Sequence, residues 1–122
     1  VTDICVPISR LAEAVEDPRA DIAASPITGP ILGHVGDGNF HAILLIDPDN
    51  AAERSAALRL SDQMVDRALR LGGTATGEHG VGMGKLKFMD QEHGPAWGLM
   101  GDLKRQLDPL NILNPGKLVQ QN

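Results

Sequence analysis

The spacing of apolar and polar residues predicts a short strand followed by a helix at the start of the chain. Residues 4–6 form an apolar run that a proline ends, which is typical of a strand. Apolar residues then recur at helical intervals over residues 8–15, and Ser9 is suited to cap that helix. Pro18 predicts a break, with a new turn of helix over residues 19–24.

The longest helical pattern runs from Asn50 to about Leu71. Asn50 and Glu53, three residues apart, are typical of a capping box. Gly72 follows the last turn, where glycine commonly ends a helix. Apolar residues at intervals of three and four indicate the buried face of this helix: Ala57, Leu60, Met64, Ala68 and Leu71.

Residues 30–46 predict a β-hairpin between the two helical patterns. The dipeptide Asp37-Gly38 suits a two-residue turn, because both central residues of that turn need positive φ. This turn places His34 opposite His41, with Cβ atoms about 4.5–5.5 Å apart on one face. A slip of one residue would put the two side chains on opposite faces. The hairpin therefore makes two imidazoles a candidate pair of metal ligands.

A glycine-rich segment, residues 73–85, follows the longest helix and carries an acid beside a base. Its spacing matches neither the phosphate-binding P-loop nor the dinucleotide-binding fingerprint. Glu78 could supply an oxygen ligand to an ion held by His34 and His41, which leaves His79 to move protons. Two imidazoles and a carboxylate suit Zn²⁺, and also Mn²⁺ or Fe²⁺. The alternative interpretation is a flexible surface loop with incidental charges.

The order of the predicted elements indicates an α+β fold. Strand, helix, hairpin, helix and extended segment match a β-α-β-β-α-β layout, a ferredoxin-like antiparallel sheet with helices packed on one face. A C-terminal helix begins at Pro95 and is stopped by Asp108-Pro109. The apolar face of this helix comprises Leu99, Met100, Leu103 and Leu107. With 122 residues, we expect a single domain over residues 1–122.

Charge and composition narrow the classes of partner and compartment. The formal net charge is −5, and acidic and basic residues are interspersed, which argues against nucleic acid. One cysteine, Cys5, excludes an internal disulfide and fits a reducing compartment such as the cytoplasm. No apolar run approaches the roughly 20 residues of a membrane helix. The abrupt start at Val1, just before a strand, indicates a piece of a longer polypeptide.

Three motifs together resemble the C-terminal part of FAD-linked oxidases, flavoproteins that oxidise 2-hydroxy acids. They are GHVGDGNFH at 33–41, GTATGEHGVG at 73–82 and LDPLNILNPGK at 107–117, in the order and spacing of that family. The likeness covers nearly the whole chain. It is greatest to D-lactate dehydrogenases of the cytochrome-linked type and to D subunits of glycolate oxidase.

The resemblance implies a role for several polar residues of these motifs. A divalent metal, Zn or Mn, would be bound by His34, His41 and Glu78. Catalysis and ligand binding would fall to four other residues: His79 as catalytic base, Asn39 in the substrate pocket, and Asn114 and Lys117 near the flavin. Ile43 stands where the 2-hydroxyglutarate enzymes of the family carry Asn, which favours a substrate of the lactate or glycolate type.

The reaction implied by the resemblance is oxidation of a D-2-hydroxy acid. His79 would take the hydroxyl proton while hydride leaves the α-carbon for FAD, and a positioned base contributes roughly 10²–10⁴ in rate. FAD would be bound mainly by a FAD-binding domain that these residues do not include. We therefore expect the isolated chain to be inactive and to self-associate through exposed apolar surface. We expect a cytoplasmic location, with peripheral membrane contact through the electron acceptor as the alternative.

Two other functions stay open at this point. One is a stand-alone metal-binding or regulatory module with a ferredoxin-like fold and no chemistry of its own. The other is a zinc hydrolase, because two histidines and a glutamate also serve metalloproteases. The chain has no His-Glu-x-x-His on a helix, which counts against the hydrolase. An upstream flavin domain in the same reading frame would count against the stand-alone module.

Overall fold

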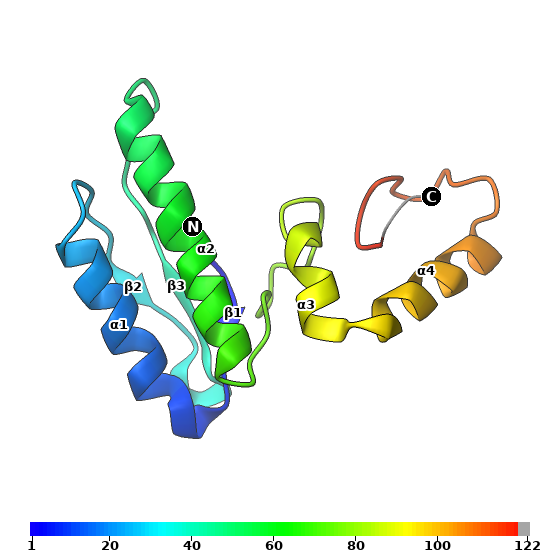
Figure 1. Ribbon diagram of the computed structural model, residues 1–122, viewed down its shortest axis with the longest axis horizontal. Coiled ribbons are helices and arrows are strands. Elements are labelled where there is room, and N and C mark those ends of the chain that lie inside the picture. The colour runs from blue at the N-terminus through cyan, green and yellow to red at the C-terminus, as the bar shows by residue number, and fades with distance from the viewer. Residues whose placement is uncertain (120–122) are drawn as a thin grey trace. The chain divides into compact units, whose positions relative to one another are not determined.

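The computed structural model describes residues 1–119, and these residues form two compact units (Figure 1). The first unit is Val1–His79, and the second begins at Gly80. The first unit combines an antiparallel sheet with two long helices, so the predicted α+β class is confirmed. The strands and helices of this unit are β1 (Ile4–Cys5), α1 (Leu11–Ala23), β2 (Ile31–Leu32), β3 (Asn39–Ala42) and α2 (Ala51–Arg70).

Within the described residues the sheet has the strand order β1-β3-β2, with β3 in the centre. Both pairings are antiparallel. Beyond β1, Thr74 forms a single antiparallel bridge with Cys5. The extended segment after α2 therefore lies at the sheet edge where a β-α-β-β-α-β fold has its fourth strand. The expected fourth strand is reduced here to one bridge.

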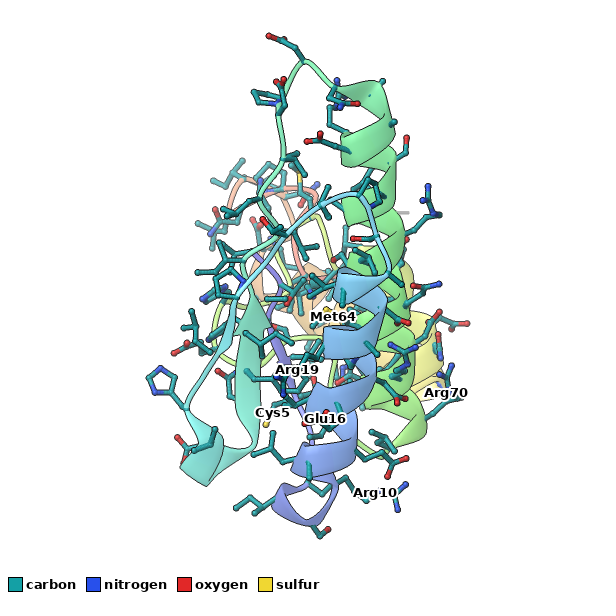
Figure 2. All side chains as sticks on the ribbon, turned by 90° about the vertical axis from the view of Figure 1, so that its left-hand side faces the viewer. Cys5, Arg10, Glu16, Arg19, Met64 and Arg70 are labelled. Carbon is teal, nitrogen blue, oxygen red and sulfur yellow. The ribbon has the colours of Figure 1, made fainter. Side chains whose placement is uncertain are left out.

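The two long helices lie on the same face of the sheet (Figures 1 and 2). Ile4 of β1 and Phe40 of β3 are fully buried, and so is Met64 on α2. Successive side chains of a strand point to opposite faces, so Asp3 and His41 point away from the helices. The apolar core and the polar cluster thus occupy opposite faces of one small sheet.

The α1 helix runs through Pro18 without a break, contrary to the sequence prediction. A 3-10 turn over Ile8–Arg10 precedes it, and the predicted cap by Ser9 is wrong, because no side chain caps either of these helices in the described structure. Pro18 is fully buried, in line with Ala14 and Ile22 at intervals of four residues. Packing of this stripe compensates for the hydrogen bond that a proline cannot donate.

The α2 helix agrees with its prediction at both ends. The Asn50 side chain accepts hydrogen bonds from the backbone N–H groups of Ala52 at 3.1 Å and Glu53 at 3.2 Å. The Asn50 amide donates in turn to the Glu53 carboxylate at 2.8 Å. The helix ends at Arg70, and Gly72 has a left-handed φ of 78°. Its buried residues are Ala56, Leu60, Met64, Val65 and Ala68, so three of the five predicted positions are buried.

The predicted antiparallel pairing of β2 with β3 is confirmed, but the predicted two-residue turn and register are wrong. Leu32, not His34, lies opposite His41, a shift of two residues from the expected register. Residues Val35–Asp37 form a 3-10 turn, and the chain reverses at Gly38. The carbonyl of Gly38 accepts a hydrogen bond from the N–H of Val6 at 3.0 Å. The turn is therefore tied to the chain after β1, a long-range contact that the hairpin pattern did not include.

The second unit contains α3 (Met89–His93) and α4 (Pro95–Leu107). The α4 helix begins and ends where the sequence predicts. Its buried residues are Trp97 and Gly101, whereas the predicted apolar face is mainly exposed to solvent, with Leu107 82% exposed. Across residues 1–119 no helix is both long enough and apolar enough to span a membrane.

Replacement of Asn50 by Ala tests the cap of α2. The substitution removes the acceptor of two backbone N–H groups, and the free energy of unfolding should fall by about 1 kcal/mol. Chemical denaturation followed by circular dichroism measures this change. Ser55→Ala, at an exposed position of the same helix, should change stability by less than about 0.5 kcal/mol. Equal stability of the wild type and Asn50→Ala would contradict the capping role.

Candidate metal site

Three side chains from distant parts of the first unit converge on one point. His34 follows β2, His41 lies on β3, and Glu78 follows α2. The Nε2 atoms of the two histidines lie 3.5 Å (His34) and 3.0 Å (His41) from Oε1 of Glu78. The three potential ligand atoms all lie within 4.8 Å of one another. The structure thus brings together the three residues that the sequence named as metal ligands.

These separations fit the ligand geometry of a divalent ion. A tetrahedral ion with bonds of about 2.1 Å holds its ligand atoms about 3.4 Å apart. His41 is buried, whereas His34 and Glu78 are open to solvent. An ion among these ligands would be held on one side by protein and would be accessible on the other, as in metal sites that act on a substrate.

The orientation of the His41 ring also favours a cation. Its Nδ1 atom lies 3.0 Å from the carbonyl oxygen of Thr2. A carbonyl can only accept, so Nδ1 carries a proton, and in the neutral form of the ring Nε2 then carries a lone pair. That lone pair faces the Glu78 carboxylate at 3.0 Å. The Nε2 lone pair and the carboxylate would repel each other at this distance unless a proton or a metal ion lies between them. Histidines that bind metal through one nitrogen commonly donate a hydrogen bond through the other, as His41 does here.

The error in the hairpin register did not separate the histidines. A shift of two residues preserves the face of the sheet to which a side chain points, because the strand period is two. His34 lies beyond the end of β2 and still reaches Glu78. The predicted convergence is therefore present without the predicted cross-strand pair.

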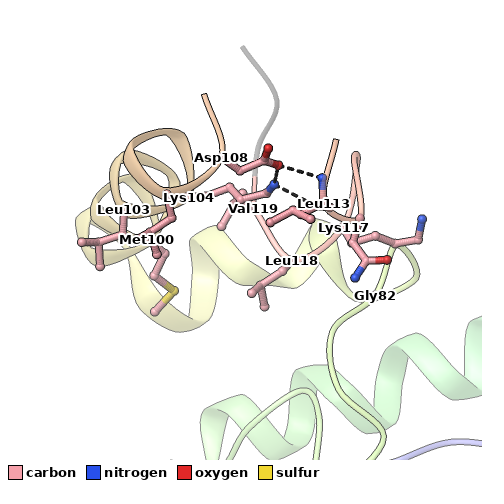
Figure 3. Close-up of a pocket in the computed structure, with 11 residues that line it drawn as sticks. Gly82, Met100, Leu103, Lys104, Asp108, Leu113, Lys117, Leu118 and Val119 are labelled. Carbon is pink, nitrogen blue, oxygen red and sulfur yellow. Dashed lines mark hydrogen bonds and ion pairs between the residues drawn. The ribbon is translucent and has the colours of Figure 1, made fainter. Parts of the chain in front are cut away.

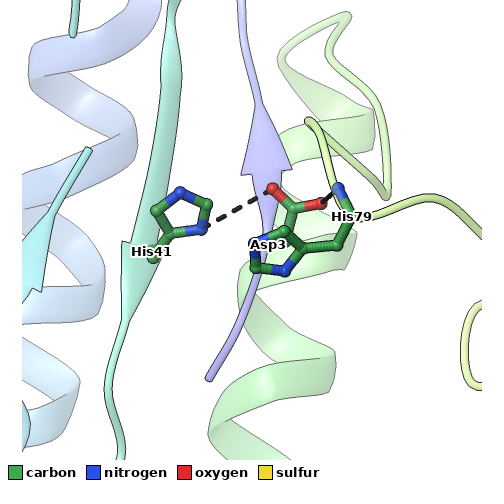
Figure 4. A group of neighbouring side chains, drawn as sticks. All are labelled: Asp3, His41 and His79. Atoms are coloured by element: carbon green, nitrogen blue, oxygen red, sulfur yellow. Dashed lines mark hydrogen bonds and ion pairs between the residues drawn. The ribbon is translucent and has the colours of Figure 1, made fainter. Parts of the chain in front are cut away.

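His79, the expected base, lies beside this cluster (Figure 4). Its ring stacks on the ring of His41, with centroids 5.0 Å apart and planes inclined by 10°. Its side chain is about half exposed. The stacked imidazole is thus held next to the candidate ion site with access to solvent, as a group that exchanges protons with a substrate must be.

Asp3 is the polar residue of this cluster that the sequence analysis missed. It is 2% exposed, and its carboxylate accepts from the Asn39 amide at 2.9 Å and from the Thr76 hydroxyl at 3.1 Å. The other donors are the backbone N–H groups of Gly77, Glu78 and His79. The only local signal was a charged residue entering a predicted strand. Its partners lie 36 positions away, at Asn39, and more than 70 positions away, in residues 76–79, so nothing near Asp3 marks its role.

The surroundings of Asp3 keep it ionised. Burial is the largest influence and raises its pKa, but the donors from His79, Asn39, Glu78 and Thr76 together outweigh burial and lower the pKa from 3.8 to about 2. Asp3, His41 and His79 form a second possible ligand group. Because both Asp3 oxygens already accept hydrogen bonds, the group with Glu78 is the better candidate.

Asn39, the expected substrate contact, is buried beside Asp3. Besides Asp3, its amide nitrogen donates to the carbonyl of Ile4 at 3.1 Å. Its Oδ1 atom is buried, with no hydrogen-bond partner among the described residues. The amide nitrogen is thus committed to the protein, and the amide oxygen is shielded from solvent. The substrate role of Asn39 stays a prediction.

The two expected flavin contacts, Asn114 and Lys117, belong to the second unit. Both line a cavity of about 660 Å³ whose walls are mainly apolar side chains of α4 and the C-terminal segment (Figure 3). Asn114 has a left-handed φ of 48°, and a turn follows it. The cofactor role of these two residues stays a prediction.

Asp108 holds the segment that leads to this turn. Its carboxylate accepts from the backbone N–H groups of Ile112 at 3.0 Å and Leu113 at 2.9 Å, and it pairs with the Lys104 ammonium group. The same ammonium group donates to the Leu113 carbonyl at 2.7 Å. The hydrogen bond from Lys104, helped by the two backbone donors, lowers the pKa of Asp108 below its ordinary value against the opposing effect of burial.

The lowered pKa of Asp108 predicts acid sensitivity of the second unit. A carboxyl group with a lowered pKa in the folded state stabilises the fold above its unfolded pKa of about 3.9, and this contribution disappears as pH falls through the folded value. Trp97, the chain's one tryptophan, donates its indole N–H to the Leu118 carbonyl at 3.1 Å and reports on this unit. Its fluorescence should show a midpoint of chemical denaturation that falls as the pH drops below about 4.

Asp108→Asn is the matched variant for this measurement. It should already be less stable at pH 7, and its midpoint should depend less on pH over the same range than that of the wild type. Parallel pH curves for the two proteins would contradict the role assigned to Asp108.

Comparison with known proteins agrees with the motifs. The family model "FAD linked oxidases, C-terminal domain" matches residues 1–118. The chain is 47% identical to a probable mitochondrial D-lactate dehydrogenase of Danio rerio over 98% of this chain and 24% of the relative. It is 45% identical to a mitochondrial D-lactate dehydrogenase [cytochrome] of Arabidopsis thaliana, over 98% of this chain and 21% of the relative. It is 37% identical to glycolate oxidase subunit GlcD of Bacillus subtilis, over 95% and 25%.

The chain thus spans about a quarter of the length of the curated relatives that it matches, or slightly less. The family model covers nearly the whole sequence, and the relatives align over almost all of it. The resemblance inferred from the three motifs is confirmed. The chain belongs to the family of C-terminal domains of FAD-linked oxidases.

Proposed function

We propose that this chain is the metal- and substrate-binding part of a flavin-dependent enzyme that oxidises a D-2-hydroxy acid of the lactate or glycolate type. The observation that carries the proposal is the convergence of the His34 and His41 Nε2 atoms on the Glu78 carboxylate. Membership of the FAD-linked oxidase family supports the redox chemistry. The names of the relatives, D-lactate dehydrogenase and glycolate oxidase subunit, support the substrate class.

The residues of the chain would divide the work between binding and proton transfer. When bound, a Zn or Mn ion held by His34, His41 and Glu78 would polarise the substrate hydroxyl and carboxylate, and FAD would accept the hydride. His79 would take the hydroxyl proton, since its half-exposed ring lies against His41. Asn39 would line the substrate pocket from its buried position beside Asp3.

The remaining parts of the proposal concern partners and location. FAD would be bound mainly by a FAD-binding domain, to which Asn114 and Lys117 add contacts. The exposed apolar side chains of α4, such as Leu103 and Leu107, offer a surface for that domain and for self-association of the isolated chain. We keep the cytoplasm, with an electron acceptor at a membrane, as the proposed location, although two of the relatives carry "mitochondrial" in their names.

Metal content tests the ligand set directly. The purified protein is loaded with Zn²⁺ or Mn²⁺, desalted and analysed by mass spectrometry for metal. The wild type should retain close to one ion per chain, and the double variant His34→Ala, His41→Ala should retain almost none, because two of its three ligands are gone. His93→Ala, a histidine of α3, is the control and should retain the metal. Equal metal in the wild type and the double variant would reject the site.

Replacement of His79 by Gln tests the base. The variant should bind metal like the wild type, since His79 is outside the ligand set. In the protein that also contains the FAD-binding domain and is loaded with flavin, with D-lactate or glycolate as substrate and an artificial electron acceptor, kcat should fall roughly 10²–10⁴-fold.

His93→Gln is the control for this assay and should keep the wild-type rate. A His79→Gln variant with an unchanged kcat would remove His79 from the proton-transfer role. Metal binding without oxidation of either acid by the flavin-loaded wild type that contains the FAD-binding domain would favour the alternative function, a metal-binding module without catalysis.

A further inference from the structure

We propose that Asp3 is the positioning residue of this site, whose carboxylate fixes the backbone of Glu78 and His79 so that both side chains face His41. The proposal rests on the proposed function, because it assigns Asp3 a purpose within the same metal site. Asp3 itself touches neither metal nor substrate in this scheme. It acts through the residues that do.

The hydrogen bonds to Asp3 form a compact cradle. Three successive backbone N–H groups donate to its Oδ2 atom, from Gly77 at 2.9 Å, Glu78 at 3.1 Å and His79 at 2.9 Å. The Thr76 hydroxyl adds a fourth bond to the same oxygen at 3.1 Å. Consecutive N–H groups directed at one anion are a known binding arrangement of the backbone. The anion in this case is a side chain of the protein, so the segment is held in one conformation.

A close contact at Gly77 supports the same conclusion independently. A Cβ atom at this position would overlap the Asn39 amide and the Asp3 carboxylate. The segment can therefore approach β1 and β3 as closely as it does only with glycine at position 77. Asp3 thus supplies the acceptor for these hydrogen bonds, and Gly77 leaves the space that they need.

Asp3 also lies against the other half of the site. The pairing of Ile4 with Phe40 places Asp3 opposite His41 on the neighbouring strand. Its Oδ1 atom lies 3.6 Å from Nδ1 of His41, the nitrogen that donates to the Thr2 carbonyl. One buried carboxylate thus contacts both the strand that carries His41 and the segment that carries Glu78 and His79 (Figure 4).

If Asp3 only stabilised the fold, its hydrogen-bond donors would not need to come from the residues of the candidate site. The backbone donors to Asp3 come from the pair of residues whose side chains meet His41, together with the glycine before them. A neutral amide at position 3 has one acceptor oxygen and no charge. With that oxygen at the Oδ2 position, the bonds from residues 76–79 lose their ionised acceptor and the NH₂ group faces the Asn39 amide, which is itself a donor. Asp3→Asn should therefore release the segment while preserving the size of the side chain.

The experiment compares the purified wild type with Asp3→Asn. Zn²⁺ affinity is measured by calorimetric titration, and amide hydrogen exchange is measured at residues 77–79 without metal. We expect the Kd for Zn²⁺ to rise 10–100-fold, the range seen when a residue that orients metal ligands is lost. We also expect the amides of residues 77–79 to exchange at least tenfold faster. Asn50→Ala is the stability control, because it weakens α2 without a contact to the site, and its Zn²⁺ affinity should match the wild type.

Two further variants keep the test valid if Asp3→Asn does not fold. Thr76→Val removes one donor and should raise the Kd less than Asp3→Asn does. Gly77→Ala keeps the charge of Asp3 but displaces the segment, and it should raise the Kd and the exchange rates together.

The possible outcomes separate this inference from the proposed function. If Asp3→Asn, or Gly77→Ala in its place, behaves like Asn50→Ala, with unchanged affinity and exchange, Asp3 is not a positioning residue. If the wild type binds no Zn²⁺ or Mn²⁺, the proposed metal site fails instead. Exchange at residues 77–79 then still decides whether Asp3 holds the segment.

Discussion

The buried carboxylate of Asp3 is the interaction on which the polar face of the first unit depends. A charge removed from water is costly unless hydrogen bonds replace its hydration, and bonds from N–H groups to an ionised acceptor are among the stronger ones. The backbone of residues 77–79 supplies such bonds. The pairing of β1 with β3 places Asp3 beside His41, and the bridge from Cys5 to Thr74 delivers the segment to the same strand. The position of the polar cluster therefore depends on the pairing of the sheet and on the segment that follows α2.

Local signals in the sequence were enough to predict the ends of α2 and α4. The cap of α2 joins residues three positions apart, and the start of α4 depends on one proline. The hairpin register was wrong because its turn is bonded to Val6, more than 30 positions away. The break at Pro18 was also wrong, because burial of the proline ring against the core outweighs a missing hydrogen bond. In both cases a tertiary contact overrode a rule that holds for isolated segments.

In the candidate site, too, local signals predicted some residues, whereas residues that depend on tertiary contacts were missed. His34, His41 and Glu78 were named from residue chemistry and from motifs, and the structure brings their ligand atoms together. Asp3 belongs to none of the motifs, so residue type alone could not connect it with Glu78. The apolar stripe of α4 was found by its spacing, but spacing does not tell whether a face is covered, and its leucines are exposed. Metal binding, and the roles of His79, Asn39, Asn114 and Lys117, stay predictions.

The contacts of Asp3 also set a limit on where the chain can be cut. Asp3 and its partners in residues 76–79 are 73 to 76 positions apart, and closing a flexible loop of that length costs about 4 kcal/mol of chain entropy. Such a contact cannot form early from neighbouring residues and depends on the intervening helices being folded. A fragment that begins at Pro7 would keep the three motifs but would lack β1 and the acceptor of these bonds. The smallest piece that can hold the cluster is therefore defined by a two-residue strand rather than by the motifs.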